Sequence, residues 1–66
     1  EYLAAEKDAS ILQKKIGYSS FIMKKNDAYF LALCRDNEKV FLDKDKYVVQ
    51  GYGIAGVVNA HGIIRF

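Results

Sequence analysis

The chain has 66 residues, which suffices for one domain and leaves no room for two. Its composition, 52% hydrophobic and 27% charged, excludes a disordered polar segment. One cysteine excludes an internal disulfide framework, and one cysteine with one histidine excludes a zinc site closed by these two residue types alone. The net charge of +2, with acidic residues interleaved among basic ones, predicts a mixed surface rather than a basic stripe.

Residues 1–66 are therefore expected to form a single small domain. The chain begins at Glu1 without a methionine and ends on the apolar Phe66, which favours a fragment or a processed subunit of a larger protein. The single free cysteine favours a reducing compartment such as the cytoplasm.

Residues 1–16 are predicted to form a helix. Lys14 and Lys15 would lie in its last turn, where they complement the helix dipole, and Gly17 is suited to end it in the left-handed conformation. No Ser, Thr, Asp or Asn precedes the first turn, so the start of the helix has no capping residue. The helix would either fray there or continue from earlier sequence.

An apolar stripe runs along this helix at alternating spacings of three and four residues. It consists of Tyr2, Ala5, Ala9, Leu12 and Ile16. One interpretation is a helix that packs across a small sheet. The other is self-association, because the spacing also fits the a and d positions of a coiled coil.

Residues 18–66 are predicted to be rich in β-structure, with short strands at 18–24, 28–34, 39–42, 46–50, 54–58 and 63–66. Both alternating faces of residues 28–34 are apolar, which favours a central strand buried on both sides. Gly62 would supply a positive φ in the last turn, and the glycines at 51, 53 and 56 suit a bent or bulged strand. The expected fold is α+β: an N-terminal helix followed by a small antiparallel sheet or partly open barrel of five or six short strands.

The expected core consists of the larger apolar side chains of these elements. They are Leu12, Ile16, Phe21, Met23, Phe30, Leu31, Leu33, Phe41, Val48, Ile54, Val57 and Ile63.

Three sequence patterns match known motifs but lack their context. Residues 51–56 fit G-x-G-x-x-G, yet strand formers follow where a helix should begin, and no acidic residue follows. Residues 43–45 open like a calcium loop, but Tyr47 and Val48 occupy the positions that need an oxygen ligand and a glycine. Residues 47–64 carry no charge, but their polar residues and glycines favour core strands over a membrane segment. We therefore expect no cofactor and no metal site.

Cys34 and His61 are the one combination that could form a nucleophile and a base. Cys34 ends a strand that is expected to be buried, and His61 falls in a predicted turn, so an inert thiol and a solvated imidazole are favoured. We expect no catalytic residue and no enzymatic activity.

The two basic pairs of the sequence flank aromatic residues, which suggests an alternative function. Lysines can follow phosphates while rings stack on bases, as in modules that bind single-stranded nucleic acid. The residues of this candidate surface are Lys14, Lys15, Tyr18, Phe21, Lys24 and Lys25. The pattern applies only if the end of the helix and the first β-turn lie together.

The favoured function is a non-catalytic module for protein–protein interaction or oligomerisation, or a small subunit of a larger assembly. So short a chain has a marginal core, and apolar area buried against a partner would add stability. The helix stripe and residues 47–64 offer more apolar surface than one small sheet requires. The predicted partner-binding residues are Tyr2, Ala5, Ala9, Leu12 and Ile16, and the partner is a second copy or a larger protein assembly.

Overall fold

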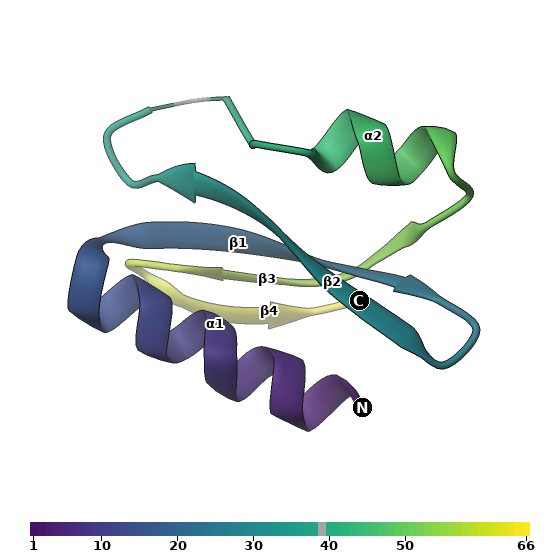
Figure 1. Cartoon of the computed structure of the whole chain (residues 1–66). Coiled ribbons are helices and arrows are strands. Elements are labelled where there is room, and N and C mark those ends of the chain that lie inside the picture. Colours follow the sequence, from purple (N-terminus) through teal and green to yellow (C-terminus); the bar gives the residue numbers. More distant parts are fainter. Residues whose placement is uncertain (39) are drawn as a thin grey trace.

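A helix, a hairpin, a second short helix and a second hairpin follow one another along the chain (Figure 1). The structure is a computed structural model that describes residues 1–38 and 40–66. Its elements are α1 (Tyr2–Ile16), β1 (Tyr18–Lys25), β2 (Ala28–Arg35), α2 (Lys44–Val49), β3 (Gly53–Asn59) and β4 (Gly62–Arg65). The strands form one open antiparallel sheet in the order β2-β1-β3-β4. The α+β class and the N-terminal helix are confirmed, but the described residues hold four strands rather than five or six.

Helix α1 ends where its sequence predicts. Gly17 adopts the left-handed conformation with φ 67°, and its N–H donates to the carbonyl of Gln13 at 3.1 Å. At the other end, Glu1 makes no side-chain capping hydrogen bond. As the sequence predicts, α1 has no side-chain cap at its N-terminal end and ends at a left-handed glycine.

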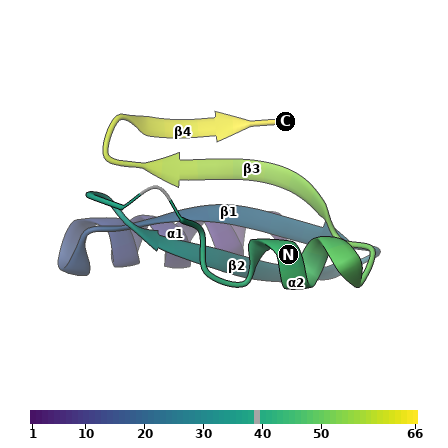
Figure 2. The same ribbon diagram turned by 90° about the horizontal axis from the view of Figure 1, so that it is seen from above.

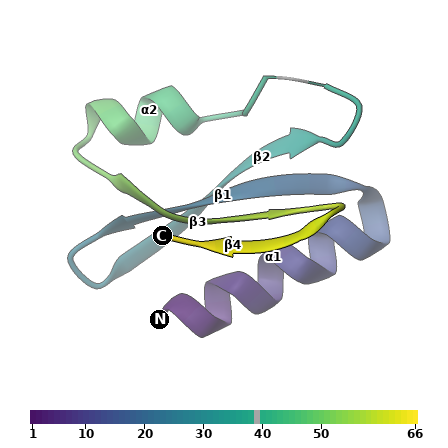
Figure 3. The ribbon, with the colours of Figure 1, turned by 180° about the vertical axis from the view of Figure 1, so that it is seen from behind.

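The two helices lie on opposite sides of the sheet (Figures 1 and 3). On the α1 side, Ile22 of the central strand β1 packs with Ala9 of α1 and Val58 of β3, and all three side chains are buried. Ala9 has a small side chain, so the helix can approach the sheet closely at this point. Tyr2 and Ala5 extend this contact toward the start of α1.

Aromatic rings cover much of the opposite face. Phe30 of β2 stacks on Tyr47 of α2, with 5.0 Å between ring centroids, and meets Tyr52 edge-on at 5.2 Å. Phe21 of β1 packs on Phe41, with 4.1 Å between centroids. Phe30, Tyr47 and Tyr52 contact one another and form an aromatic cluster that fixes α2 on the sheet, whereas Phe21 and Phe41 pack as a pair.

Two predicted strands are not strands. Residues 46–49 belong to α2, and Gln50 follows them as its C-cap. Tyr47 of α2 is held by the aromatic cluster, and the prediction of a strand at 46–50 is wrong. Residues 40–42 form no strand either, although the Leu42 N–H donates to the carbonyl of Leu33. Lys39, the first residue of that prediction, lies outside the described residues.

The prediction of a central strand at 28–34 is also wrong, because β2 is an edge strand and β1 is central. Both faces of β2 are nevertheless covered in part. Tyr29 and Leu31 contact the α1 side of the core, whereas Ala32 and Cys34 are buried on the other face. The layers above and below the sheet thus cover β2 on both faces, although it has a neighbouring strand on one side only.

The second hairpin follows its predicted course. Strands β3 and β4 are joined at Ala60 and His61, and Gly62 has φ 134°. The pairing of β3 with β1 shifts register between Ile22 and Met23, which places a bulge in the glycine-rich stretch. The G-x-G-x-x-G pattern thus ends within a strand and does not open a helix.

The buried core is smaller than predicted and is built from smaller side chains. Met23 is the one residue of the predicted set that is fully buried, and Ile16, Phe30, Val48, Ile54 and Ile63 are exposed. The buried hydrophobic residues are Ala9, Ile22, Met23, Ala32, Cys34 and Val58. Much of the large apolar surface of the chain is therefore in contact with solvent.

Candidate interaction surface

Strand β4 forms an open edge of the sheet (Figure 2). It is the last strand in the order, and all four of its residues are exposed. Ile63 is 47% exposed, Ile64 52%, and Phe66, which follows the strand, 76%. Within the described part of the chain, nothing pairs with the outer side of β4. We call Ile63, Ile64 and Phe66, together with the free backbone of β4, the edge surface.

Arg65 is the one charged residue of β4, and its side chain points toward α1. The Arg65 guanidinium donates two hydrogen bonds to the Glu6 carboxylate, at 2.8 and 2.9 Å. These hydrogen bonds are the largest cause that lowers the pKa of Glu6 below its ordinary value, and the same pairing raises the pKa of Arg65. A charged residue on an open edge commonly prevents another strand from pairing there. The charge of Arg65, however, is neutralised by Glu6.

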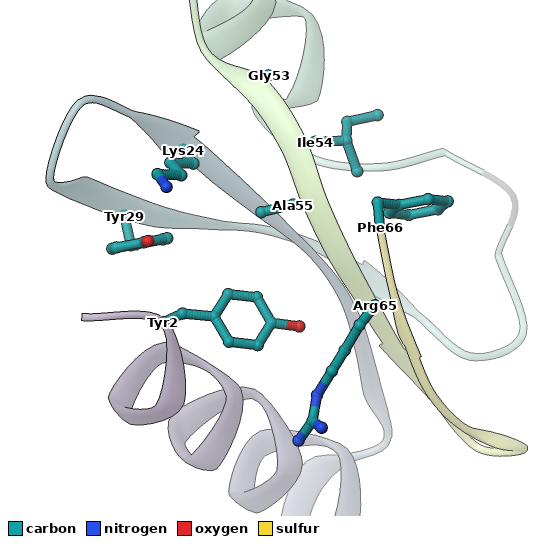
Figure 4. Close-up of a pocket in the computed structure, with 8 residues that line it drawn as sticks. All are labelled: Tyr2, Lys24, Tyr29, Gly53, Ile54, Ala55, Arg65 and Phe66. Atoms are coloured by element: carbon teal, nitrogen blue, oxygen red, sulfur yellow. The ribbon is translucent and has the colours of Figure 1, made fainter.

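Tyr2 lies beside this ion pair, on the sheet face that α1 covers. Its hydroxyl is buried and has no hydrogen-bond partner among residues 1–38 and 40–66. Burial is the largest cause that raises the pKa of Tyr2, and the Glu6 carboxylate adds to it. The ring points from α1 toward Arg65 (Figure 4).

An open pocket of about 530 Å³ lies between this group and the start of β3. Tyr2, Tyr29, Ile54 and Phe66 give it apolar walls, and Lys24 contributes an ammonium group that lies 5.7 Å from the centroid of the Tyr29 ring (Figure 4). The pocket adjoins the edge surface through Phe66. Its two charged side chains are Lys24 and Arg65, and Arg65 is paired with Glu6.

The predicted partner-binding stripe of α1 faces mainly inward. Ala9 is buried, and Tyr2 and Ala5 pack against the core on the sheet. Leu12 is half-buried and Ile16 is 57% exposed. This arrangement agrees with the first interpretation of the stripe, in which the helix packs on its own sheet.

The lysines of the nucleic-acid alternative lie near opposite ends of β1. Lys14 and Lys15 precede the start of the strand and Lys24 and Lys25 end it, a separation of roughly 20 Å at about 3.3 Å per residue. Lys25 donates a hydrogen bond to the carbonyl of Gln50 at 2.8 Å.

The two rings of that alternative are engaged separately. Phe21 packs on Phe41, and the hydroxyl of Tyr18 accepts a hydrogen bond from Arg35 at 3.1 Å. The six residues do not form one continuous surface.

Cys34 and His61 are not brought together. Cys34 is buried on β2, where its thiol donates to the carbonyl of Glu38 at 3.0 Å, and His61 is exposed in the turn after β3. Burial is the main cause that raises the pKa of the Cys34 thiol, and the charges of Glu38 and Asp36 add to it. A raised pKa makes a thiol a poorer nucleophile at neutral pH.

The sequence patterns predicted neither the ion pair between Glu6 and Arg65 nor the open edge of β4. Their residues are 59 positions apart, and no periodic pattern links them. The position of a strand within the sheet order is likewise not encoded in its own residues. The one available signal was Arg65, a charge at the end of an otherwise apolar segment.

Among the described residues, no helix is both long and apolar enough to cross a membrane, and no three His, Cys, Asp or Glu side chains gather into a metal-binding group. No protein-family model matches the chain, and comparisons with curated proteins and with solved structures found no match either.

Proposed function

We propose that this chain is a non-catalytic protein–protein interaction or assembly module and that its contact region is the edge surface. The observation that carries the proposal is the exposure of Ile63, Ile64 and Phe66 at a strand whose outer side is unpaired among the described residues. An open edge offers backbone hydrogen bonds, and the apolar side chains next to it supply contact area.

The location of the contact region differs from the helix stripe that the sequence suggested. Moving α1 away from the sheet would expose Ala9 and Ile22, which are fully buried, and would break the ion pair between Glu6 and Arg65. Binding at β4 requires none of these changes. The edge surface is thus the less costly place for a partner.

Photo-cross-linking in the cells that produce the protein tests this proposal. A photoreactive amino acid at position 64 is expected to give an adduct of discrete mass, either with the chain itself or with another protein. The same amino acid at position 49, on the exposed outer side of α2, is the control and should give none. Absence of a discrete adduct from position 64 would contradict the proposed function.

A further inference from the structure

The hydrogen-bond pattern of the second hairpin determines which backbone groups of β4 face outward. The Phe66 N–H donates to the carbonyl of Ala55 at 3.1 Å, so this pair belongs to the hydrogen-bonded set. Hydrogen-bonded and non-hydrogen-bonded pairs alternate along an antiparallel ladder. Because Arg65 pairs with Gly56 and Ile63 with Val58, both fall in the non-hydrogen-bonded set. Their N–H and C=O groups therefore point away from β3, toward the open edge.

We propose that β4 pairs antiparallel with β4 of a second copy of this chain, with Ile64 facing Ile64 of that copy across a twofold axis. The inference rests on the proposed function and names its partner. The two four-stranded sheets would join into one continuous sheet. The interface is isologous, so each copy contributes the same strand.

This register satisfies all outward-facing backbone groups of the strand. Centring the axis on Ile64 places Ile63 opposite Arg65 of the second copy, and Arg65 opposite its Ile63. Each of these two symmetric pairs then exchanges both of its N–H···O=C hydrogen bonds. Centring on Ile63 would instead place Arg65 opposite His61, which lies in the turn and not in the strand.

The charges of β4 favour the same register. Centring the axis on Arg65 would set two guanidinium groups directly opposite one another, and like charges in facing positions destabilise a sheet. In the Ile64 register, Arg65 faces an isoleucine, and its guanidinium remains bonded to Glu6 of its own copy. The aliphatic part of Arg65 can then cover Ile63 of the second copy.

The side chains also fit a twofold contact. On the sheet face opposite α1, the two Ile64 side chains would meet in a non-hydrogen-bonded pair, where Cα atoms lie about 4.5 Å apart. Phe66 would lie opposite Gly62 of the second copy, which has no side chain to oppose the ring. Ile64 is 52% exposed and Phe66 76% exposed, so both have surface to lose on pairing.

Complementary charges at position 64 test the register. Analytical ultracentrifugation and native mass spectrometry of the unmodified chain should show a dimer that dissociates on dilution from millimolar to micromolar concentration. Ile64→Lys alone and Ile64→Glu alone should each weaken self-association by roughly tenfold or more, because like charges then face one another. An equimolar mixture of the two variants should form a heterodimer with one copy of each.

The control is Val49→Lys, a substitution of an 87% exposed residue on α2, which should dimerise like the unmodified chain. Circular dichroism confirms that each variant remains folded, and any variant that unfolds is replaced by Ile64→Ser, which should also weaken the dimer. A chain that is monomeric at millimolar concentration overturns the proposal. So does a mixture of the Lys and Glu variants that stays monomeric. A cross-link from position 64 to a different protein would overturn self-pairing while leaving the proposed function intact.

Discussion

Gly56 provides the space that the Tyr2 hydroxyl occupies under α1. A Cβ atom at this position would lie 2.3 Å from the Tyr2 oxygen and 3.1 Å from the carbonyl oxygen of Ile64. The first contact is far too close, and the second involves backbone that cannot move freely. Gly56 is thus required by a close approach and not by an unusual backbone angle.

Gly56→Ala is therefore expected to lower the free energy of unfolding by about 1–3 kcal/mol. Tyr2→Phe removes the clashing oxygen, so the alanine should cost less in that background, although the contact with Ile64 remains. Urea unfolding of the two single variants and the double variant measures the difference. Equal costs of Gly56→Ala in both backgrounds would show that Tyr2 does not occupy this space.

The ion pair between Glu6 and Arg65 should make stability depend on pH in the acid range. The pKa of Glu6 is lowered in the folded chain, so its contribution is complete above its ordinary value of 4.5 and is lost as the pH falls through the lower, folded value. Glu6→Gln should thus be less stable than the unmodified chain at neutral pH, and the difference should shrink in acid. Thermal unfolding across this pH range checks the prediction, with Asp8→Asn, an exposed position on the same helix, as control.

At the level of the elements, α1 and both hairpins could be predicted because their signals are local. Gly17 stops the helix, Asn26 and Asp27 turn the first hairpin, and Gly62 follows the turn of the second. Each of these signals lies within a few residues of the feature that it specifies. Contacts with distant parts of the chain reinforced these features and did not change them.

Helix α2 and the edge position of β2 could not be predicted in this way. Residues 46–50 have the composition of a strand, but Tyr47 packs on Phe30 and Tyr52, and this tertiary contact outweighs the local preference. An apolar pattern on both faces of a strand reports the layers above and below it. It carries no information about the strands at its sides, and for the same reason the edge surface of β4 was not foreseen.

The end of α1 offers a direct test of a local signal. Gly17→Ala should destabilise the chain by about 1 kcal/mol, because a residue with a Cβ is strained in the left-handed conformation. Gly53→Ala is the matched control, since its added Cβ would meet no atom within 4 Å and its φ is not positive. A chemical-denaturation midpoint for each variant decides the comparison, and an equal effect of both would contradict the capping role of Gly17.

On the scale of the whole molecule, β1 lies between the two hairpins and holds them together. It pairs along its length with β2 and over a shorter stretch with β3, whereas β4 contacts the sheet through β3 alone (Figure 2). The second hairpin is the less supported part of the sheet. A partner strand at β4 would give it support on its free side.

Self-pairing through β4 should therefore link stability to concentration. The midpoint of thermal unfolding of the unmodified chain is expected to rise as the chain is concentrated, because mass action favours the paired state. Ile64→Lys should unfold at a temperature that does not change over the same series. A constant midpoint for the unmodified chain at concentrations where it is a dimer would show that pairing does not stabilise the fold.

The burial of Cys34 allows local opening of the fold to be measured chemically. The sequence holds one cysteine, its side chain is 2% exposed, and the pKa of its thiol is raised mainly by burial. An alkylating reagent can react with it only when the packing over β2 opens, so the rate of alkylation in native buffer counts such openings without any added label. Because β2 and β4 are opposite edges, a partner at β4 that slows this reaction must act through the whole width of the sheet.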